Sequence, residues 1–195
     1  MVDFVRNFIE VFGSDMFSAL TQEANRRMLK YSVSDAIPCV FYGHLPGKSY
    51  DFPKLTGTDI VSNAYGEWGD ENQICVKSYP SAPEKLENHL IWFYSKVNPA
   101  AVLINKYDSE YGSFIGVRCK IVRNGKIRTF GAHRDIDDNV VLDSQLDGSD
   151  GQITWQQLWE AQEKLAGEAV HNLLLDFPEL AKLEEIKYVL KRAGR

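Results

Sequence analysis

The hydrophobic pattern is clearest in the middle of the chain, where alternating segments surround one helical segment. Alternation of apolar and polar residues predicts strands over 73–79 and 113–123. We also expect strands over 101–107 and 126–131, the second returning from a hairpin, and an edge strand at 140–142. Apolar residues three and four apart predict a helix over 83–97, which Asn98-Pro99 stops. Asn124-Gly125 predicts a tight hairpin, since both residues tolerate positive φ. This order of elements predicts an antiparallel sheet of four to five strands with a helix on one face.

The two ends of the chain carry helical patterns. Apolar residues repeat at helical spacing over residues 2–12, so we expect a short amphipathic helix there, and a second one after Ser14. Near the C-terminus, Thr154 and Gln157 form a capping box for a helix over 155–176, and Pro178 opens another over 179–193. The expected architecture is one α+β domain over residues 1–195. It has a helical N-terminal extension (1–35), a sheet core (36–143) and a C-terminal helical pair (152–195).

Residues 43–72 hold closely spaced glycines and prolines, which indicate a long irregular segment. Aromatic residues make up 12 % of the chain, and several of them lie in or beside this segment. Large aromatic side chains are enriched at interface hot spots. Five of them are therefore candidate contacts with a protein partner: Tyr42, Tyr50, Phe52, Tyr65 and Trp68. The alternative is that these rings cover the open face of the sheet.

Composition and charge narrow the classes of function. Hydrophobic residues are 44 % and charged residues 25 %, which is typical of a globular domain and excludes a disordered or collagenous chain. The net charge of −5 has the wrong sign for a chain that binds nucleic acid with its whole surface. One basic cluster is nevertheless a candidate nucleic-acid contact: Arg118, Lys120, Arg123, Lys126, Arg128 and Arg134. The simpler interpretation is that these residues form the solvated face of a hairpin.

The cysteines and the apolar runs indicate in which cellular compartment the protein is expected. Cys39, Cys75 and Cys119 are an odd number without a C-x-x-C pair, which argues against a disulfide framework and a structural zinc site. Each lies in an apolar segment, where a free cysteine behaves as a small buried hydrophobe. Met1 is not followed by a basic and apolar leader, and no apolar run approaches the ~20 residues of a membrane helix. We expect a cytoplasmic protein that does not contact membranes.

Polar clusters offer little catalytic chemistry. His133, Arg134 and Asp135 form the densest one, and a histidine beside carboxylates can act as a general base. Adjacent strand residues point to opposite faces, however, so His133 and Arg134 should not converge. The turn at Asp147–Gly151 is similar to half of a calcium loop but lacks most side-chain ligands. No phosphate-binding loop, dinucleotide fingerprint or nucleophile elbow occurs, so we expect no cofactor and no metal, and an enzyme is the weaker hypothesis.

The middle segment also carries a family resemblance. Its residues are Trp68-Gly69, the strand at 73–79, Ser81-Ala82-Pro83, the helix, and Tyr107-x-x-Glu110-x-Gly112-x-Phe114-x-Gly116. Together they resemble the ferredoxin-like domain of the Api92/YubB-like proteins, which bacteriophages and conjugative plasmids encode. The resemblance covers roughly residues 60–130, and Ala82 stands where that family has an aromatic residue. It implies a ferredoxin-like β-α-β-β core and a mobile-element accessory protein, and it supplies no catalytic residue.

Three functional hypotheses follow. The first is a non-catalytic phage or plasmid protein in the cytoplasm of a bacterial host. It would bind a host protein and inhibit a bacterial defence system. We expect that partner to have a basic nucleic-acid-handling surface, because opposite charges favour the encounter with an acidic protein. The alternative is a nucleic-acid-binding module that uses the basic hairpin. The second alternative is a hydrolase that uses His133 and the nearby aspartates.

Overall fold

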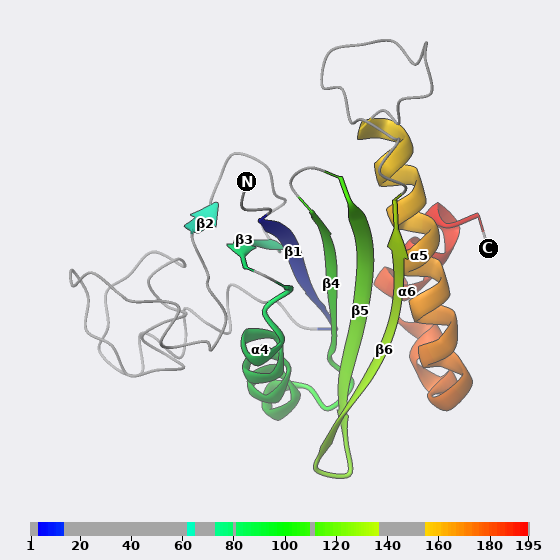
Figure 1. Cartoon of the computed structure of the whole chain (residues 1–195). Helices are drawn as coiled ribbons and strands as arrows, with labels where there is room; N and C mark the ends of the chain where they lie inside the picture. Colours follow the sequence, from blue (N-terminus) through cyan, green and yellow to red (C-terminus); the bar gives the residue numbers. More distant parts are fainter. Residues whose placement is uncertain are drawn as a thin grey trace, which may run out of the picture.

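A computed structural model describes residues 4–13, 62–64, 73–79, 81–109, 112–136 and 155–194. The elements are β1 (Val5–Phe12), β2 (Ser62–Ala64), β3 (Gln73–Ser78), α4 (Glu84–Val97), β4 (Val102–Ser109), β5 (Phe114–Arg123), β6 (Lys126–Asp135), α5 (Trp155–Asp176), the 3-10 helix η1 (Pro178–Lys182) and α6 (Glu184–Arg192). They form three layers, with α4 on one side of the sheet and α5 and α6 on the other (Figure 1). We call the two sides of the sheet the α4 face and the α5 face.

Within the described residues, the sheet has six strands in the order β2-β3-β1-β4-β5-β6. Every neighbouring pair is antiparallel. Strands β3 and β4 both pair with β1, so they run parallel to each other and α4 connects them across the sheet. The α+β class and the antiparallel sheet are confirmed. The expected β-α-β-β order is present as β3, α4, β4 and β5.

The helix expected over residues 2–12 is wrong, because β1 is a strand in the interior of the sheet. The N-terminal part of the chain is therefore not a purely helical extension. Val5, Ile9 and Val11 alternate on the α4 face as a strand requires, but the position between the first two is a buried asparagine, Asn7. That polar residue interrupts the two-residue pattern, and Phe8 on the other face completes an accidental helical spacing.

The remaining elements follow the local patterns closely. Strands β3, β4 and β5 and helix α4 begin and end within two residues of the expected limits. Asn124 and Gly125 have φ of 51° and 67°, which confirms the tight hairpin. Strand β6 continues to Asp135, four residues beyond the expected end. Helix α5 spans the expected residues, whereas the expected helix at 179–193 is divided into η1 and α6 at Leu183, whose backbone is extended.

Apolar side chains are buried on both sides of the sheet: Leu86, Leu90, Ile91 and Tyr94 of α4 are buried on the α4 face, and a second hydrophobic cluster lies between the α5 face and the C-terminal helices. It is built from inward side chains of β4 and β5 and from α5, which presents alanines toward the sheet: Val102, Ile104, Ile115, Val117, Cys119, Ile121, Ala166, Ala169, Val170 and Leu173. Cys119 is buried as expected, and the side chains of Cys39 and Cys75 lie outside the described residues. Trp159 of α5 is 56 % exposed. Among the described residues, no helix has the length and apolar character needed to span a membrane.

Several expectations fall outside the described residues. They are the helix after Ser14, the five candidate aromatic contacts Tyr42, Tyr50, Phe52, Tyr65 and Trp68, the edge strand at 140–142, and the turn at Asp147–Gly151. Within the segment expected to be irregular, residues 62–64 form β2, so the expectation is wrong at that point.

Candidate functional site

The α4 face holds a cluster of buried charges. Glu87 of α4 and Lys120 of β5 are both fully buried, and Lys120 Nζ lies 3.1 Å from Glu87 Oε2. Arg118, two residues earlier on the same face of β5, places Nη2 2.9 Å from Glu87 Oε1. Lys120 Nζ also donates a 2.6 Å hydrogen bond to Asn88 Oδ1. Since a buried charge is costly unless it is paired, each member of this cluster depends on the others.

Amide and hydroxyl side chains extend this cluster across the sheet. Asn105 Nδ2 of β4 donates to Glu87 Oε1 at 2.6 Å and to Asn7 Oδ1 of β1 at 3.1 Å. Asn7 Nδ2 in turn donates to Ser78 Oγ of β3 at 2.8 Å. One hydrogen-bonded network, which we call the Glu87 network, therefore joins α4 to four strands. Such networks specify one arrangement of the elements that they connect.

Beside the Glu87 network, three rings gather on the α4 face where β4, β5 and β6 lie side by side. Tyr107 and His133 are stacked with ring centroids 6.2 Å apart, and Phe114 lies 5.4 Å from His133. We call Tyr107, Phe114 and His133 the aromatic platform. The Arg118 guanidinium lies over the Tyr107 ring, 5.3 Å from its centroid, and so connects the platform to the Glu87 network.

Gly116 makes room for the platform. It lies between Phe114 and Arg118 on the same face of β5 and opposite both Tyr107 and His133. A Cβ at this position would lie closer than 3.0 Å to the Cζ and hydroxyl of Tyr107. The absence of a side chain therefore lets the Tyr107 ring lie flat across β5 toward His133.

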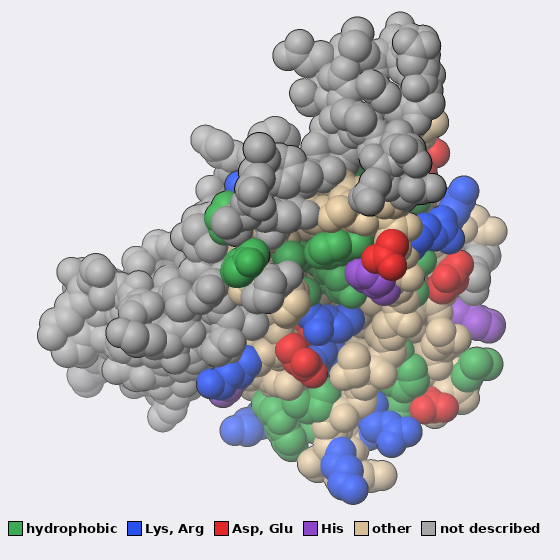
Figure 2. Space-filling view, viewed as in Figure 1, with side chains coloured by type: hydrophobic (Ala, Val, Ile, Leu, Met, Phe, Trp, Pro, Cys, Tyr) green, Lys and Arg blue, Asp and Glu red, His purple; other side chains and the backbone are tan. Residues whose placement is uncertain are grey.

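The platform lies at the surface, and its three side chains are partly buried. The His133 side chain is 47 % exposed, whereas Tyr107 and Phe114 are half-buried. Burial raises the pKa of Tyr107 above its usual 10.0; Arg118 opposes this rise and Glu87 adds to it. Figure 2 shows hydrophobic, basic, acidic and histidine side chains meeting in the middle of this face. Cavities of about 740 Å³ and about 460 Å³ lie beside α6, and no platform residue lines either of them.

The structure does not bring the six basic candidates to one surface. Arg118 and Lys120 lie on the α4 face, and both pair with Glu87. Fully buried Lys120 has no surface to offer a phosphate group. The expectation that these six residues share an exposed hairpin face is wrong at that position.

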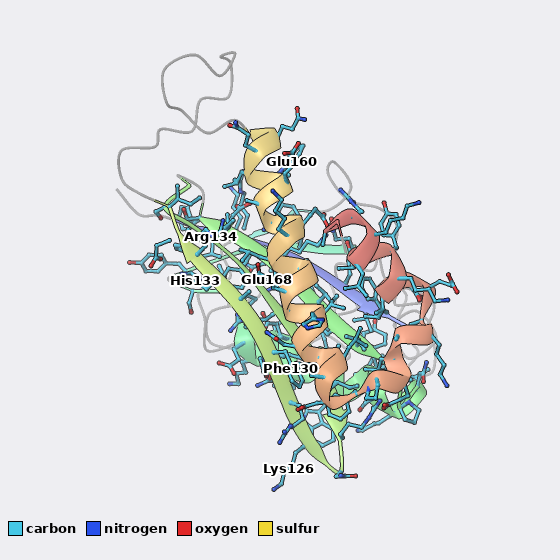
Figure 3. All side chains as sticks on the ribbon, turned by 90° about the vertical axis from the view of Figure 1, so that its right-hand side faces the viewer. Lys126, Phe130, His133, Arg134, Glu160 and Glu168 are labelled. Atoms are coloured by element: carbon cyan, nitrogen blue, oxygen red, sulfur yellow. The ribbon has the colours of Figure 1, made fainter. Side chains whose placement is uncertain are left out.

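The other four basic candidates lie elsewhere on the hairpin. The Arg123 guanidinium packs over the Phe177 ring, and its Nη2 lies 3.5 Å from Glu179 Oε1. Arg128 Nη2 lies 3.6 Å from Asp176 Oδ2. Lys126 is at the end of the hairpin, and Arg134 is near the far end of β6 (Figure 3).

His133 and Arg134 point to opposite faces, as the strand geometry predicts. His133 is opposite Gly116 on the α4 face, and Arg134 is opposite Ile115, whose side chain belongs to the core on the α5 face. Asp135 shares the face of His133, and its Oδ1 lies 3.1 Å from His133 Nε2. Asp135 is largely exposed, so this His–Asp pair is accessible to solvent and does not lie in an enclosed site.

Sequence reasoning missed Glu87, Asn7, Tyr107 and Phe114 as members of a site. The motif that carries the family resemblance contained part of the signal, because its Phe114 and Gly116 are two positions apart on one strand and so share a face. Among the described residues, no group of three or more histidine, cysteine or acidic side chains could hold a metal ion.

Comparison of the chain with models of protein families, with curated proteins and with solved structures finds no match.

Proposed function

We propose that this chain is a non-catalytic binding protein, which engages a protein partner through the aromatic platform. The observation that carries the proposal is the cluster of Tyr107, Phe114 and His133 at the surface of a sheet face, with Arg118 over the Tyr107 ring. Tyrosine, phenylalanine and arginine are enriched at protein interfaces, where they anchor a few strong contacts. No platform residue lines either of the two cavities beside α6, and a small substrate needs a concave site, so a macromolecule is the better candidate.

The Glu87 network supports this proposal because, through Arg118, it fixes the position of the platform. Arg118 contacts both Glu87 and the Tyr107 ring, so the ring position depends on the buried ion pair. A surface that is held in place before binding loses less conformational entropy when the partner arrives. The network therefore favours binding without serving as the contact itself.

Nucleic acid is the less favoured partner. Four of the six basic candidates already face carboxylates: Arg118 and Lys120 face Glu87, Arg123 faces Glu179, and Arg128 faces Asp176. A phosphate backbone would compete with these carboxylates for the same cations. The resemblance of residues 60–130 to phage and plasmid proteins adds to the proposal that the partner is a host protein.

The experiment is capture of a partner from nuclease-treated bacterial lysate, followed by binding measurements with the purified partner. We expect Phe114→Ala and His133→Ala each to weaken binding at least about tenfold, as truncation of an interface anchor does. Trp159→Ala is the matched control, because Trp159 is an exposed aromatic residue on α5, on the other side of the sheet.

Three results would contradict the proposal. The platform variants could bind the partner as tightly as the wild type does. The Trp159→Ala control could lose as much affinity as they do. Alternatively, the wild-type chain could retain only RNA or DNA, with an affinity that falls steeply with salt, and the nucleic-acid hypothesis would then replace the proposal.

A further inference from the structure

Among the strands that the structure describes, β6 lies at one edge of the sheet. Within the described residues it pairs with β5 alone, along all ten of its residues. At the opposite edge, β2 has only three residues. A long edge strand presents a row of backbone groups that can pair with another extended chain.

The register identifies the backbone groups that point outward. Ile136 N–H donates to the Ser113 carbonyl at 2.8 Å, so these two residues form a hydrogen-bonded pair. Hydrogen-bonded and non-hydrogen-bonded pairs alternate along an antiparallel ladder. The unbroken β5–β6 register therefore directs the even-numbered residues of β6 toward β5. The residues whose N–H and C=O point away from β5 are Ile127, Thr129, Gly131, His133 and Asp135.

The outward residues also connect this edge to the aromatic platform. Their side chains lie on the α4 face, where His133 belongs to the platform and where Thr129 and Gly131 are exposed. An extended chain paired with β6 would place alternate side chains beside His133 on this face.

Charge indicates which extended chain fits. Strand β6 carries three cations, Lys126, Arg128 and Arg134, against the single carboxylate of Asp135. Arg128 Nη2 already lies 3.6 Å from Asp176 Oδ2, whereas Lys126 and Arg134 are exposed near the two ends of the strand. Two copies of β6 paired edge to edge would bring these cations together, which disfavours a second copy of this chain as the occupant. An acidic segment would face them with the opposite charge.

We propose that β6 is a docking edge for an extended, acidic segment of the protein partner, which adds to the sheet as a further antiparallel strand. This inference rests on the proposed function and specifies how the partner is recognised. Main-chain hydrogen bonds to the five outward residues supply affinity, and Lys126 and Arg134 together with His133 select the sequence.

The direct test uses synthetic peptides and the full chain. The probe is a fluorescein-labelled ten-residue peptide of alternating Glu and Val, and its matched control alternates Lys and Val. We expect the Glu/Val peptide to bind at least about tenfold more tightly. Reversing the sign of the peptide charges turns several attractive cross-strand pairs into repulsive ones, and together this changes the binding free energy by more than about 1 kcal/mol. N-methylation of alternate residues should abolish binding, since it removes the donors on one edge of the peptide.

A variant of β6 tests the edge itself. In Thr129→Pro the lost N–H is one that points away from β5, so the β5–β6 ladder is kept and an edge strand tolerates the proline. We expect this variant to lose the Glu/Val peptide, while Thr129→Val, which keeps the N–H, retains it. Circular dichroism and the unfolding midpoint verify that both variants are folded.

Amide hydrogen exchange in the free protein gives a second, independent readout. The amides of Arg128, Phe130 and Ala132 should exchange slowly, and those of Thr129, Gly131 and His133 should exchange fast. Equal protection of both sets would mean that the chain already covers its own edge, and this would overturn the inference.

Two further outcomes separate this inference from the proposed function. If Thr129→Pro captures the natural partner as well as the wild type does, while His133→Ala fails, the edge is not used and the platform proposal stands. If both peptides bind equally, or neither binds, the acidic strand is refuted irrespective of the lysate experiment.

Discussion

The two faces of strand β5 differ sharply, although both faces of the sheet as a whole bury apolar side chains. Toward α5 the strand presents Ile115, Val117, Cys119 and Ile121, all fully buried among apolar side chains. Toward α4 it presents Arg118 and Lys120, which are held by the carboxylate of Glu87. Alternation along one strand thus places a hydrophobic core and a buried ionic network a few ångströms apart.

The difference concerns what each face contributes. Hydrophobic burial is non-directional and stabilises by about 25 cal/mol for each Å² removed from water, so the α5 face supplies stability. A buried ion pair contributes little net stability, because desolvation offsets its attraction, but it penalises every arrangement that leaves a charge alone. The Glu87 network therefore adds a defined geometry to the apolar packing of α4, and the aromatic platform lies directly beside the network.

The largest expected effect comes from removing the centre of the Glu87 network. Glu87→Ala leaves fully buried Lys120 and mostly buried Arg118 without their shared carboxylate. Breaking one partner of a buried ion pair typically costs about 3–5 kcal/mol, and we expect this loss in the free energy of unfolding measured with urea.

The matched control for this variant is Glu84→Ala. Glu84 lies 3.6 Å from the same Lys120 Nζ, but its side chain is 64 % exposed. We expect a change of no more than about 0.5 kcal/mol there, since exposed ion pairs contribute little. Equal losses in the two variants would show that the α4 face does not depend on its buried carboxylate.

A smaller effect is expected where the platform crosses β5. Gly116→Ala forces a methyl group into the space of the Tyr107 ring, and overpacking of this kind costs about 1–3 kcal/mol. The same substitution in a Tyr107→Ala background should cost about 0.5 kcal/mol or less, because the ring is gone. Urea unfolding of the four proteins completes this double-mutant cycle. Additive losses would mean that the glycine is needed for a reason other than the ring.

The contrast between the faces also explains which elements could be predicted. Strand β5 carries clear alternation, β4 begins with a short apolar run, the Asn-Gly turn defines β6, and α4 and α5 carry helical spacing, so local pattern and tertiary environment agree. Strand β1 could not be recognised, because its interior residue Asn7 is polar and its partners lie far along the chain, at 73–78 and 102–109. A buried asparagine has a reason only once Asn105 and Ser78 are beside it.

The candidate site follows the same rule. The opposite orientation of His133 and Arg134 could be predicted, because it depends on neighbouring positions of one strand. The Glu87 network could not, because it joins charges that are more than thirty positions apart along the chain and meet only when α4 packs on β5. Lys120 in isolation has the sequence pattern of a surface lysine.

The pH dependence of the free energy of unfolding tests the burial of Tyr107 on the α4 face. Because burial raises the pKa of Tyr107 above 10.0, the folded state holds this proton more tightly than the unfolded state does. The resulting stability is complete below pH 10 and is lost as the pH rises through the higher folded-state value. We expect the free energy of unfolding to fall more steeply above pH 10 in the wild type than in Tyr107→Phe. Parallel curves would place the Tyr107 hydroxyl in open solvent.

The smallest effect is expected on the α5 face, where a titratable group changes reactivity and not stability. Burial raises the pKa of the Cys119 thiol from 9.0 to about 12, although Lys106 opposes this rise. The thiolate fraction at pH 8 is then lower by on the order of a thousandfold, and the thiolate is the reactive form. Iodoacetamide should leave Cys119 unmodified in the native protein and alkylate it fully in urea, as read by peptide mass spectrometry. Rapid native labelling of this peptide would mean that α5 opens away from β5 under conditions in which the Glu87 network holds α4 in place.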